Sequence, residues 1–349
     1  MTNEFDVRMT GRMVVAVLIL SAAGFARPQS IQTTDNPSFA AYGDLPYQHQ
    51  LSDGRTDEQV LIQDIAPRIK ARQDIPFVIH FGDLGRPEFS CTDSWFEKTL
   101  QWWRKDLAKP VFYTPGDNDW KDCDRQKLKL RSSGLSRLTA LRETFFNPSR
   151  MREYPAEWRV EQQQQQPENL TWFHRGVRFV TQHVISKDNG RKDVLLDDPV
   201  LAVQLAEQRD RNNLVWIDQA FELAAQPETK ALVVTMQYDL FGPPNKQESM
   251  LERCTSKPAY REYCLHLQEA AARLNKPVLL VHGDTNAYCL DQPFNTALAP
   301  LLWRLNGPGD YKVIDASIVA IDPSNPARPF YVTGLLSGTS PPATCDYSF

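Results

Sequence analysis

Short apolar runs alternate with amphipathic segments along most of this chain. Runs rich in β-branched and aromatic residues, which favour strands, lie at 39–42, 77–81, 111–113, 177–184, 231–236 and 278–281. One apolar helical face follows an Asn212-Asn213 cap signal, and residues 258–274 predict another helix that ends at Asn275. Strands that alternate with helices are typical of a layered α/β domain.

Two parts of the chain depart from this alternation. Residues 311–321 and 329–332 are strand-like with no helix between them, so they predict an antiparallel hairpin. The Gln162–Gln166 run precedes Pro167 and predicts a surface loop that opens no separate domain. We therefore expect the second half of the chain to include antiparallel strands.

Four of the predicted strands lead into a Gly-Asp pair. These pairs are Gly43-Asp44, Gly82-Asp83, Gly116-Asp117 and Gly283-Asp284. Glycine lets the chain turn sharply at the end of a strand, and the ligands of α/β sheets bind outside the carboxyl ends of the strands. We therefore expect the four carboxylates to converge on one site.

The composition is that of a globular chain, and its charge argues against a nucleic-acid partner. With 42% hydrophobic and 23% charged residues, 349 residues can bury a substantial core. The net charge is −4 and the basic residues are scattered, so the sequence lacks the electrostatic footprint of a nucleic-acid-binding protein. We expect no nucleic-acid partner.

The N-terminus carries an export signal. The apolar stretch from Met13 to Ala26 is too short to span a bilayer and ends in small residues, as the core of a secretory signal does. Translation from Met9 would place Arg12 directly before this stretch, whereas a start at Met1 adds two acidic residues. We predict a signal peptide at 1–29, one domain at 30–349, a secreted or periplasmic location and no transmembrane anchor after cleavage. An uncleaved anchor is the alternative.

Six cysteines in an exported chain favour disulfides. Cys91 and Cys123 each follow a Gly-Asp strand end, so neighbouring strands would bring them together. Cys254 and Cys264 flank a short polar segment and can pair locally, which leaves Cys289 for Cys345. Free buried thiols are the alternative. The spacing of the cysteines excludes a zinc ribbon of the Cys-x-x-Cys type.

The order of the motifs resembles that of the calcineurin-like metallophosphoesterases. The matching segments are Asp44-Leu-Pro46, Gly82-Asp83, Gly116-Asp-Asn-Asp119, Val234-Thr-Met-Gln237 and Gly283-Asp-Thr-Asn286. They stand where the family has Asp-x-His, Gly-Asp, Gly-Asn-His-Asp/Glu, Val-x-x-His and Gly-His-x-His. The resemblance covers about residues 39–322. It implies a four-layer αββα sandwich of two mixed β-sheets, with two metal ions and a metal-activated hydroxide that hydrolyses phosphate esters.

This chain replaces every imidazole of the family's motifs. The replacements are Pro46, Asn118, Gln237, Asp284 and Asn286, of which Asn118 stands for the His that assists the leaving group. Only Asp44 and Asp83 match family ligands unchanged, and Asp117 replaces an Asn ligand. Carried over position by position, the resemblance implies an oxygen-only metal site made of Asp44, Asp83, Asp117, Gln237, Asp284 and Asn286.

Oxygen ligands suit hard cations such as Mg²⁺, Mn²⁺ or Ca²⁺, whereas imidazole suits zinc and iron. Closely packed carboxylates also cannot all stay ionised without a cation or raised pKa values. We therefore predict one hard divalent cation rather than two or none. Because Pro46 and Asn286 both fall at the family's first metal position, the second position, formed by Asp83, Asp117, Gln237 and Asp284, is the one we expect to be kept.

Two histidines come near the ends of site-forming strands. His282 directly precedes Gly283 and is our candidate for a catalytic imidazole beside Asn118, with His80 and His49 as further candidates. Strand alternation could instead bury His282 and His80 behind the site. The other histidines, His174, His183 and His266, are predicted to be packing or surface residues.

Two functions from different classes fit this sequence. The first is a secreted or periplasmic metal-dependent hydrolase of small phosphomonoesters or phosphodiesters, in which the cation polarises a phosphoryl oxygen. The second is a catalytically inactive protein of the same fold that binds a cation or another ligand, because a fold alone does not define an activity.

Overall fold

The computed structural model describes residues 36–242, 248–294 and 298–348, together with Met1. The chain divides into residues 1–33 and residues 34–349, and the fold below is that of the second unit. Apart from Met1, the predicted signal peptide at 1–29 lies outside the described residues.

The described residues form two mixed β-sheets. The first has the order β12-β11-β1-β2-β3, with β1 (Ser38–Tyr42), β2 (Val78–His80), β3 (Val111–Tyr113), β11 (Ser317–Ile321) and β12 (Phe330–Gly334). The second has the order β4-β5-β6-β7-β8-β10-β9, with β4 (Glu161–Gln162), β5 (Leu170–His174), β6 (Val177–Thr181), β7 (Ala231–Thr235), β8 (Val278–His282), β9 (Cys289–Asp291) and β10 (Leu302–Asn306).

Parallel strands form the centre of each sheet. β1, β2 and β3 run parallel in the first sheet, as β6, β7, β8 and β10 do in the second. Every residue of β1, β7 and β8 is buried, as expected for strands that are covered on both faces. The carboxyl ends of the parallel strands therefore meet where the Gly-Asp pairs begin.

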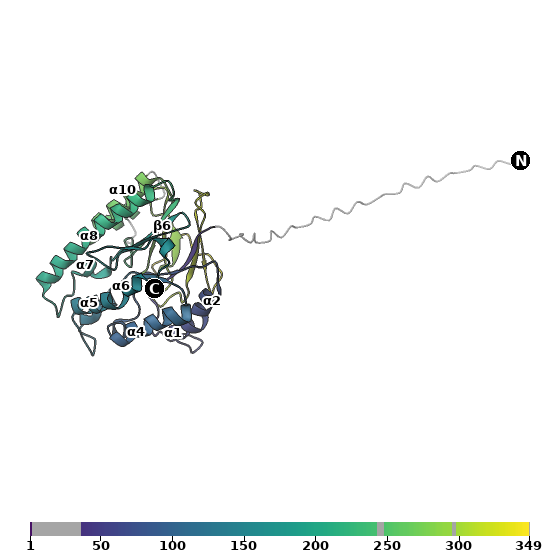
Figure 1. The fold of residues 1–349 in the computed structure, drawn as a ribbon. Helices are drawn as coiled ribbons and strands as arrows, with labels where there is room; N and C mark the ends of the chain where they lie inside the picture. The colour runs from purple at the N-terminus through teal and green to yellow at the C-terminus, as the bar shows by residue number, and fades with distance from the viewer. Residues whose placement is uncertain (2–35, 243–247, 295–297, 349) are drawn as a thin grey trace. The chain divides into compact units, whose positions relative to one another are not determined.

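Helices cover the outer faces of the sheets. They are α1 (Asp57–Val60), η1 (Leu61–Ile65), α2 (Ala66–Ala71), α3 (Pro87–Ser90), α4 (Asp93–Gln101), η2 (Trp102–Leu107), η3 (Lys121–Asp124), α5 (Gly134–Phe145), α6 (Pro148–Met151), η4 (Ala156–Trp158), α7 (Ser186–Gly190), α8 (Pro199–Ala225), α9 (Met250–Thr255), η5 (Pro258–Tyr260) and α10 (Arg261–Leu274). The helices α8 and α10 lie side by side on one face, and α1, α2 and α4 lie on the opposite side (Figure 1).

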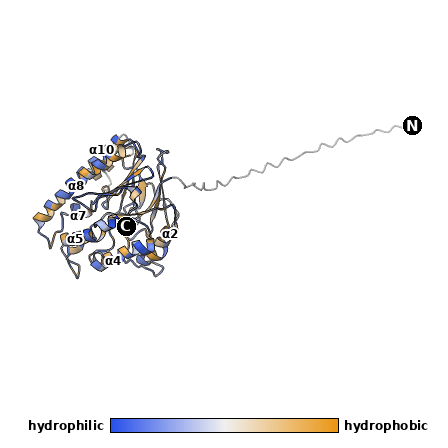
Figure 2. Cartoon of the chain, viewed as in Figure 1, coloured by the Kyte–Doolittle hydropathy of each residue, from blue (hydrophilic) through white to orange (hydrophobic). Residues whose placement is uncertain are grey.

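Two apolar cores join these layers. Aromatic side chains fill the space between the sheets: Phe112 of β3 stacks on Trp172 of β5 with ring centroids 3.6 Å apart, and Trp172 stacks on Phe179 at 5.0 Å. The second core lies between the seven-stranded sheet and the helices α8 to α10. The helices α8 and α10 carry both hydrophobic and hydrophilic residues, as amphipathic helices over a sheet do (Figure 2). The predicted αββα sandwich is confirmed.

Most predicted elements are present, and two predictions are wrong. The C-terminal hairpin is confirmed as β11 and β12, and Asn275 ends α10 with a left-handed φ of 51°. The long helix, however, begins at Pro199 behind the N-cap Asp198, because Asn213 is buried and bonds to other polar side chains instead of capping a helix. In the predicted surface loop, Gln163 and Gln166 are buried.

The three disulfides join the predicted partners. They are Cys91–Cys123, Cys254–Cys264 and Cys289–Cys345, with Cα atoms 5.4, 5.7 and 5.0 Å apart. None of the helices in the part of the chain that the structure describes combines the length and the apolar character that a membrane span requires.

Candidate functional site

The four Gly-Asp pairs lie at the carboxyl ends of the central strands. Three of their aspartates adopt left-handed backbone conformations, with φ of 49° at Asp44, 53° at Asp83 and 66° at Asp284. Aspartate tolerates this region better than most residues. The turn that each pair makes directs its carboxylate toward the same place.

Glycine is needed at these turns because the chains approach closely. A Cβ atom added at Gly116 would collide with the carboxylate of Asp83, and one at Gly283 would collide with that of Asp44 and with the ring of Phe81. Phe81 is fully buried. The glycines therefore allow the turns to approach Phe81 and one another closely, which brings their carboxylates together.

One hydroxyl bridges the first two carboxylates. Tyr47 Oη lies 2.8 Å from Asp83 Oδ2 and 3.1 Å from Asp44 Oδ1. Asn118 Nδ2 donates to the same hydroxyl at 3.3 Å, and the backbone N–H of Asn118 donates to Asp83 Oδ1 at 3.0 Å. Asp44 also accepts the backbone N–H of Asp284 at 3.1 Å. Tyr47 was not among the predicted site residues, although it stands three residues after Asp44.

One amide bridges the other two carboxylates. Gln237 Nε2 lies 3.2 Å from Asp117 Oδ1 and 3.0 Å from Asp284 Oδ1, and the Ser186 hydroxyl donates to Asp117 Oδ2 at 2.7 Å. We call Asp44, Asp83, Asp117 and Asp284 the aspartate cluster. Asp44, Asp83 and Asp117 are buried, and Asp284 is partly exposed.

A fifth aspartate fixes the loops that carry the cluster. Asp119 is fully buried and accepts the backbone N–H groups of Asp83, Leu84 and Gly116 at 3.1, 2.7 and 2.8 Å. The Tyr113 hydroxyl donates to it at 2.6 Å. Asp119 therefore orients the second and third Gly-Asp turns. Burial raises its pKa to about 6.

The aspartate cluster holds more negative charge than the protein neutralises. Burial, followed by the charges of other aspartates, raises the pKa values of Asp44, Asp83 and Asp284 well above the ordinary value. The cationic group that pairs with the cluster is Arg125, whose guanidinium lies 3.9 Å from Asp117 and which also pairs with Asp122. Its side chain is 42% exposed, so water screens its charge.

Two predicted site residues lie apart from the aspartate cluster. The Nε2 atom of His282 is 3.7 Å from Asp239 Oδ1, and its Nδ1 atom is 3.1 Å from the carbonyl oxygen of Gly283. The buried side chain of Asn286 forms no hydrogen bond with the cluster within the described ranges. Six of the eight predicted residues thus share one hydrogen-bonded network.

His282 belongs to a second polar group. Arg304 of β10 lies 3.6 Å from Asp239 and bonds to both oxygens of Asp291, and Tyr347 donates to Asp239 at 2.9 Å. We call Asp239, His282, Asp291, Arg304 and Tyr347 the arginine cluster. Burial lowers the pKa of His282.

The other candidate histidines also lie away from the carboxylates. His80 is buried against Tyr42 and Tyr113, with ring centroids 4.8 and 5.7 Å away, and burial lowers its pKa to about 3. His49 is exposed and packs edge-on against Tyr311. Strand alternation thus buries His80 behind the site.

The residues of the second metal position fit a hard cation. Their donors are carboxylate and amide oxygens, and Gln237 Oε1 is buried without a hydrogen-bond partner. Rotating this amide by about 180° would turn its oxygen toward Asp117 and Asp284, as a cation would require. Within the described ranges, one group of three potential ligand atoms lies within 4.8 Å of one another, and it consists of Cys289, Asp291 and Cys345. The two sulfurs of that group are bonded to each other, so it is not a metal site. No three carboxylates of the aspartate cluster, whose members all belong to the described residues, lie that close to one another.

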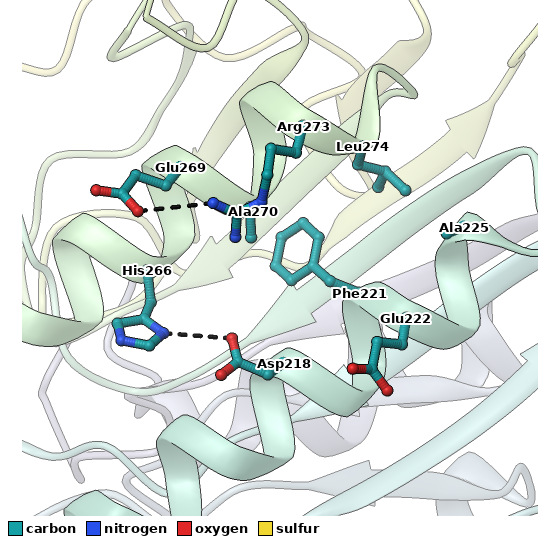
Figure 3. A pocket seen from close by; sticks show the side chains of 9 residues that line it. All are labelled: Asp218, Phe221, Glu222, Ala225, His266, Glu269, Ala270, Arg273 and Leu274. Carbon is teal, nitrogen blue, oxygen red and sulfur yellow. Dashed lines mark hydrogen bonds and ion pairs between the residues drawn. The ribbon is translucent and has the colours of Figure 1, made fainter.

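A separate cavity lies away from the aspartate cluster. A groove of about 430 Å³ runs between α8 and α10, with Phe221 and Ala270 at its base. Two side-chain pairs lie in it, His266 with Asp218 at 3.2 Å and Arg273 with Glu269 at 3.6 Å (Figure 3). The residues that line the groove do not include a member of the aspartate cluster.

Comparison with solved structures identifies the fold. PhoD superposes with a TM-score of 0.50 and 11% identity over 83% of this chain and 64% of that one. The structure titled "GAP50 the anchor in the inner membrane complex of Plasmodium" has a TM-score of 0.45 and 9% identity over 87% of this chain and 86% of that one. A 5'-nucleotidase from Candida albicans has a TM-score of 0.45 and 11% identity over 86% of this chain and 51% of that one. No family model and no curated protein match the sequence.

The likeness to PhoD supports a phosphoesterase-like fold. The chain spans less than two thirds of the length of PhoD, and the identity is too low to carry an activity from one to the other. The fold is therefore a phosphoesterase-like αββα sandwich, and the function has to be argued from the site.

Proposed function

We propose that this chain is an exported metal-dependent phosphoric ester hydrolase that holds one hard divalent cation at the aspartate cluster. The observation that carries the proposal is the convergence of four carboxylates whose nearest cationic partner, Arg125, is half-exposed and 3.9 Å away. Such a group favours cation binding, because a cation offsets the burial and the mutual repulsion that raise the pKa values of Asp44, Asp83 and Asp284.

The proposed cation ligands are Asp83, Asp117, Gln237 and Asp284. Hydrogen bonds of 3.0 and 3.2 Å already link Gln237 to Asp284 and Asp117, and Tyr47 links Asp83 to Asp44. A bound divalent cation would supply Lewis acidity toward a phosphoryl oxygen and would lower the pKa of a coordinated water. Asn286, also predicted as a ligand, forms no hydrogen bond with these four residues in the part of the chain that the structure describes.

The remaining groups would orient the substrate. Asn118 can donate its side-chain N–H to a phosphoryl oxygen, but an amide cannot deliver a proton to the leaving group. Arg125 can pair with the phosphate because its guanidinium is exposed and adjacent to Asp117. Esters with good leaving groups should therefore be the better substrates.

A second candidate is a catalytically inactive cation- or ligand-binding protein. The bridging donors favour it, since Tyr47 and Gln237 each join two carboxylates with hydrogen bonds of the protein itself. The position of His282 in the arginine cluster also favours it, because that ring is turned to Asp239.

Metal analysis followed by activity assays separates the two candidates. We expect protein purified without chelator to retain about one divalent cation and to hydrolyse phosphomonoesters or phosphodiesters with Mg²⁺, Mn²⁺ or Ca²⁺. The Asp83→Asn variant should lose both properties, while Asp239→Asn, a matched buried aspartate of the arginine cluster, should retain the metal. Metal without turnover supports the inactive protein. A folded protein without metal contradicts the hydrolase and leaves the inactive protein as a binder of another ligand.

Export is supported by the three disulfides, which persist in oxidising compartments, and by the apolar segment at 13–26. Cell fractionation with an N-terminal mass measurement tests it. We expect a chain that begins after residue 29 in the secreted or periplasmic fraction, and a full-length chain in the cytoplasm would contradict export.

A further inference from the structure

Exposed apolar side chains are concentrated in two loops and in the helix that follows the second of them. Apart from Met1, nine large apolar residues are exposed among those the structure describes, and Val215, Leu298 and Tyr311 are the three that stand apart. The other six are Leu130, Leu195, Leu196, Val200, Leu201 and Leu205, which we call the leucine patch. Leu130 is 84% exposed and Val200 is 65% exposed. Burying these side chains would be favourable, so such a patch on a protein surface indicates an interaction site.

Hydrogen bonds hold the patch together. Its members come from the loop before α5, the loop before α8 and the first turns of α8. Asp124 accepts the backbone N–H groups of Leu195 and Leu196 at 2.8 and 3.4 Å, which joins the two loops. Asp197 accepts the N–H of Leu135 at 3.1 Å, and Asp198 caps α8. Hydrophobic residues colour the N-terminal end of α8 orange in Figure 2.

Basic side chains surround the apolar ones. Lys127, Lys129 and Arg131 alternate with Leu128 and Leu130 in the loop before α5. Lys127 and Lys129 are exposed, and neither has an ion-pair partner within the described ranges. The nearby acids Asp124 and Asp197 instead accept backbone N–H groups. The chain as a whole has a net charge of −4, whereas residues 125–133 include four basic residues and no acidic one.

We propose that the leucine patch docks on an anionic phospholipid bilayer. Exposed aliphatic side chains that insert at the level of the headgroups, with lysines that contact anionic lipid, are the two features of interfacial binding. Arg125 lies in the same loop as Leu130 and is 3.9 Å from Asp117, so docking would bring the aspartate cluster close to the lipid surface. This inference does not depend on the proposed hydrolase activity.

Vesicle cosedimentation tests the proposal. The probes are vesicles of phosphatidylcholine alone and of phosphatidylcholine with phosphatidylglycerol, at low and high salt. We expect binding to the anionic vesicles that weakens with salt, because salt screens the lysines. A Leu130→Asn/Leu196→Asn/Val200→Asn variant should bind about tenfold more weakly or worse, and Lys127→Gln/Lys129→Gln should lose most of the preference for anionic lipid.

Matched controls separate docking from folding. Val215→Asn changes an aliphatic residue of α8 that is 54% exposed but lies outside the patch, and Lys105→Gln/Lys230→Gln removes two exposed lysines elsewhere. Both should bind as the parent does, with unchanged circular dichroism in all variants. Since every variant carries the same N-terminus, differences between them report on the patch. Equal binding by the patch variant and the parent would overturn the proposal. The proposal would also be overturned if the parent bound no vesicles and formed a concentration-dependent dimer that the patch variant abolished. That result would assign the surface to a second copy of the chain.

Discussion

The aspartate cluster and the arginine cluster are neighbours that differ in the groups that contact their buried carboxylates. Gln237 and Asp239 both follow β7, yet Gln237 bonds to the aspartate cluster and Asp239 lies in the arginine cluster. In the arginine cluster, Arg304 and His282 face Asp239 at 3.6 and 3.7 Å. In the aspartate cluster, hydroxyl and amide groups separate the carboxylates.

The difference shows what a buried carboxylate needs. Burial raises the pKa of Asp239, but His282 and Arg304, with backbone and hydroxyl donors, outweigh it and lower that pKa below its ordinary value. Burial also raises the pKa of Asp44, and there the charges of Asp310 and Asp117 add to it. The two clusters therefore do not differ in how deeply their carboxylates are buried. They differ in whether a cationic side chain of the protein lies beside the carboxylates, so the aspartate cluster is the one that a bound cation would stabilise.

Replacing Arg304, the cationic side chain of the arginine cluster, should have the largest effect on stability. Arg304→Met keeps the length of the side chain but leaves Asp239 and Asp291 without their charged partner, so the free energy of unfolding should fall by about 3–5 kcal/mol. Urea denaturation measures it. Adding Asp239→Asn and Asp291→Asn to this variant should recover part of the loss. A loss below about 1 kcal/mol would mean that Arg304 does not stabilise the cluster.

Acidification should destabilise the protein through a second buried polar group, which contains His183 and Glu168. His183 is buried between Glu168, 2.6 Å from Nδ1, and the Trp120 N–H, 3.1 Å from Nε2. A neutral ring satisfies both partners, and burial lowers its pKa from 6.5 to about 4. The unfolded chain therefore binds the extra proton first, and stability falls as the pH drops from 6.5 toward 4, by about 3 kcal/mol in all.

Unfolding curves at pH 7 and pH 5 for the parent and for His183→Gln test this dependence. The variant should be less stable at pH 7 but should lose less on acidification, and the difference between the two slopes isolates His183 from the other titrating groups. Parallel slopes would contradict this dependence, because they would show that the pKa of His183 is the same in the native and the unfolded state.

The sequence predicted the fold better than the site for a physical reason. Gly-Asp pairs and apolar runs are local signals, and they identified the strands that carry Asp44 and Asp83. The strand β10 was missed because Leu302–Asn306 holds Arg304, whose charge breaks the apolar pattern. The arginine is buried there because Asp291 and Asp239 lie within reach, which only the folded chain reveals.

Side-chain partners across the sheets are also not visible in the sequence. The polar Gln162–Gln166 run suggested a surface loop, yet Gln166 bonds to Asn213 of α8 at 2.6 Å. His282 stands beside Gly283, but the strand end turns its ring toward Asp239. In both cases the partner lies more than about 40 residues away, beyond the reach of periodicity.

Cation binding should stabilise the aspartate cluster and leave the arginine cluster unaffected. At about 100 times the dissociation constant, a cation that binds only the native state adds about 2.7 kcal/mol, which calorimetry detects as a higher Tm. Asp83→Asn should remove this gain, because Asp83 contacts both the Tyr47 bridge and the Asn118 backbone. Isothermal titration should show at least about a tenfold loss of affinity. An unchanged titration would rule out this location for the cation.

Removing the Tyr47 hydroxyl should have the smallest effect and distinguishes the two halves of the aspartate cluster. In Tyr47→Phe, Asp44 and Asp83 lose a shared donor that lies 3.1 and 2.8 Å away, so the cation-free protein should be destabilised by about 1–2 kcal/mol in urea. The affinity for the cation should change by less than about threefold, because the proposed ligands other than Asp83 do not contact Tyr47 and a factor of three is below 1 kcal/mol. The Tyr42→Phe variant serves as the control, since Tyr42 is a buried tyrosine of β1 that packs against His80 and contacts none of the four carboxylates within the described ranges. A tenfold or larger fall in affinity for Tyr47→Phe alone would place the cation between Asp44 and Asp83, with the phenol oxygen as a ligand, and the two halves of the cluster would then exchange roles.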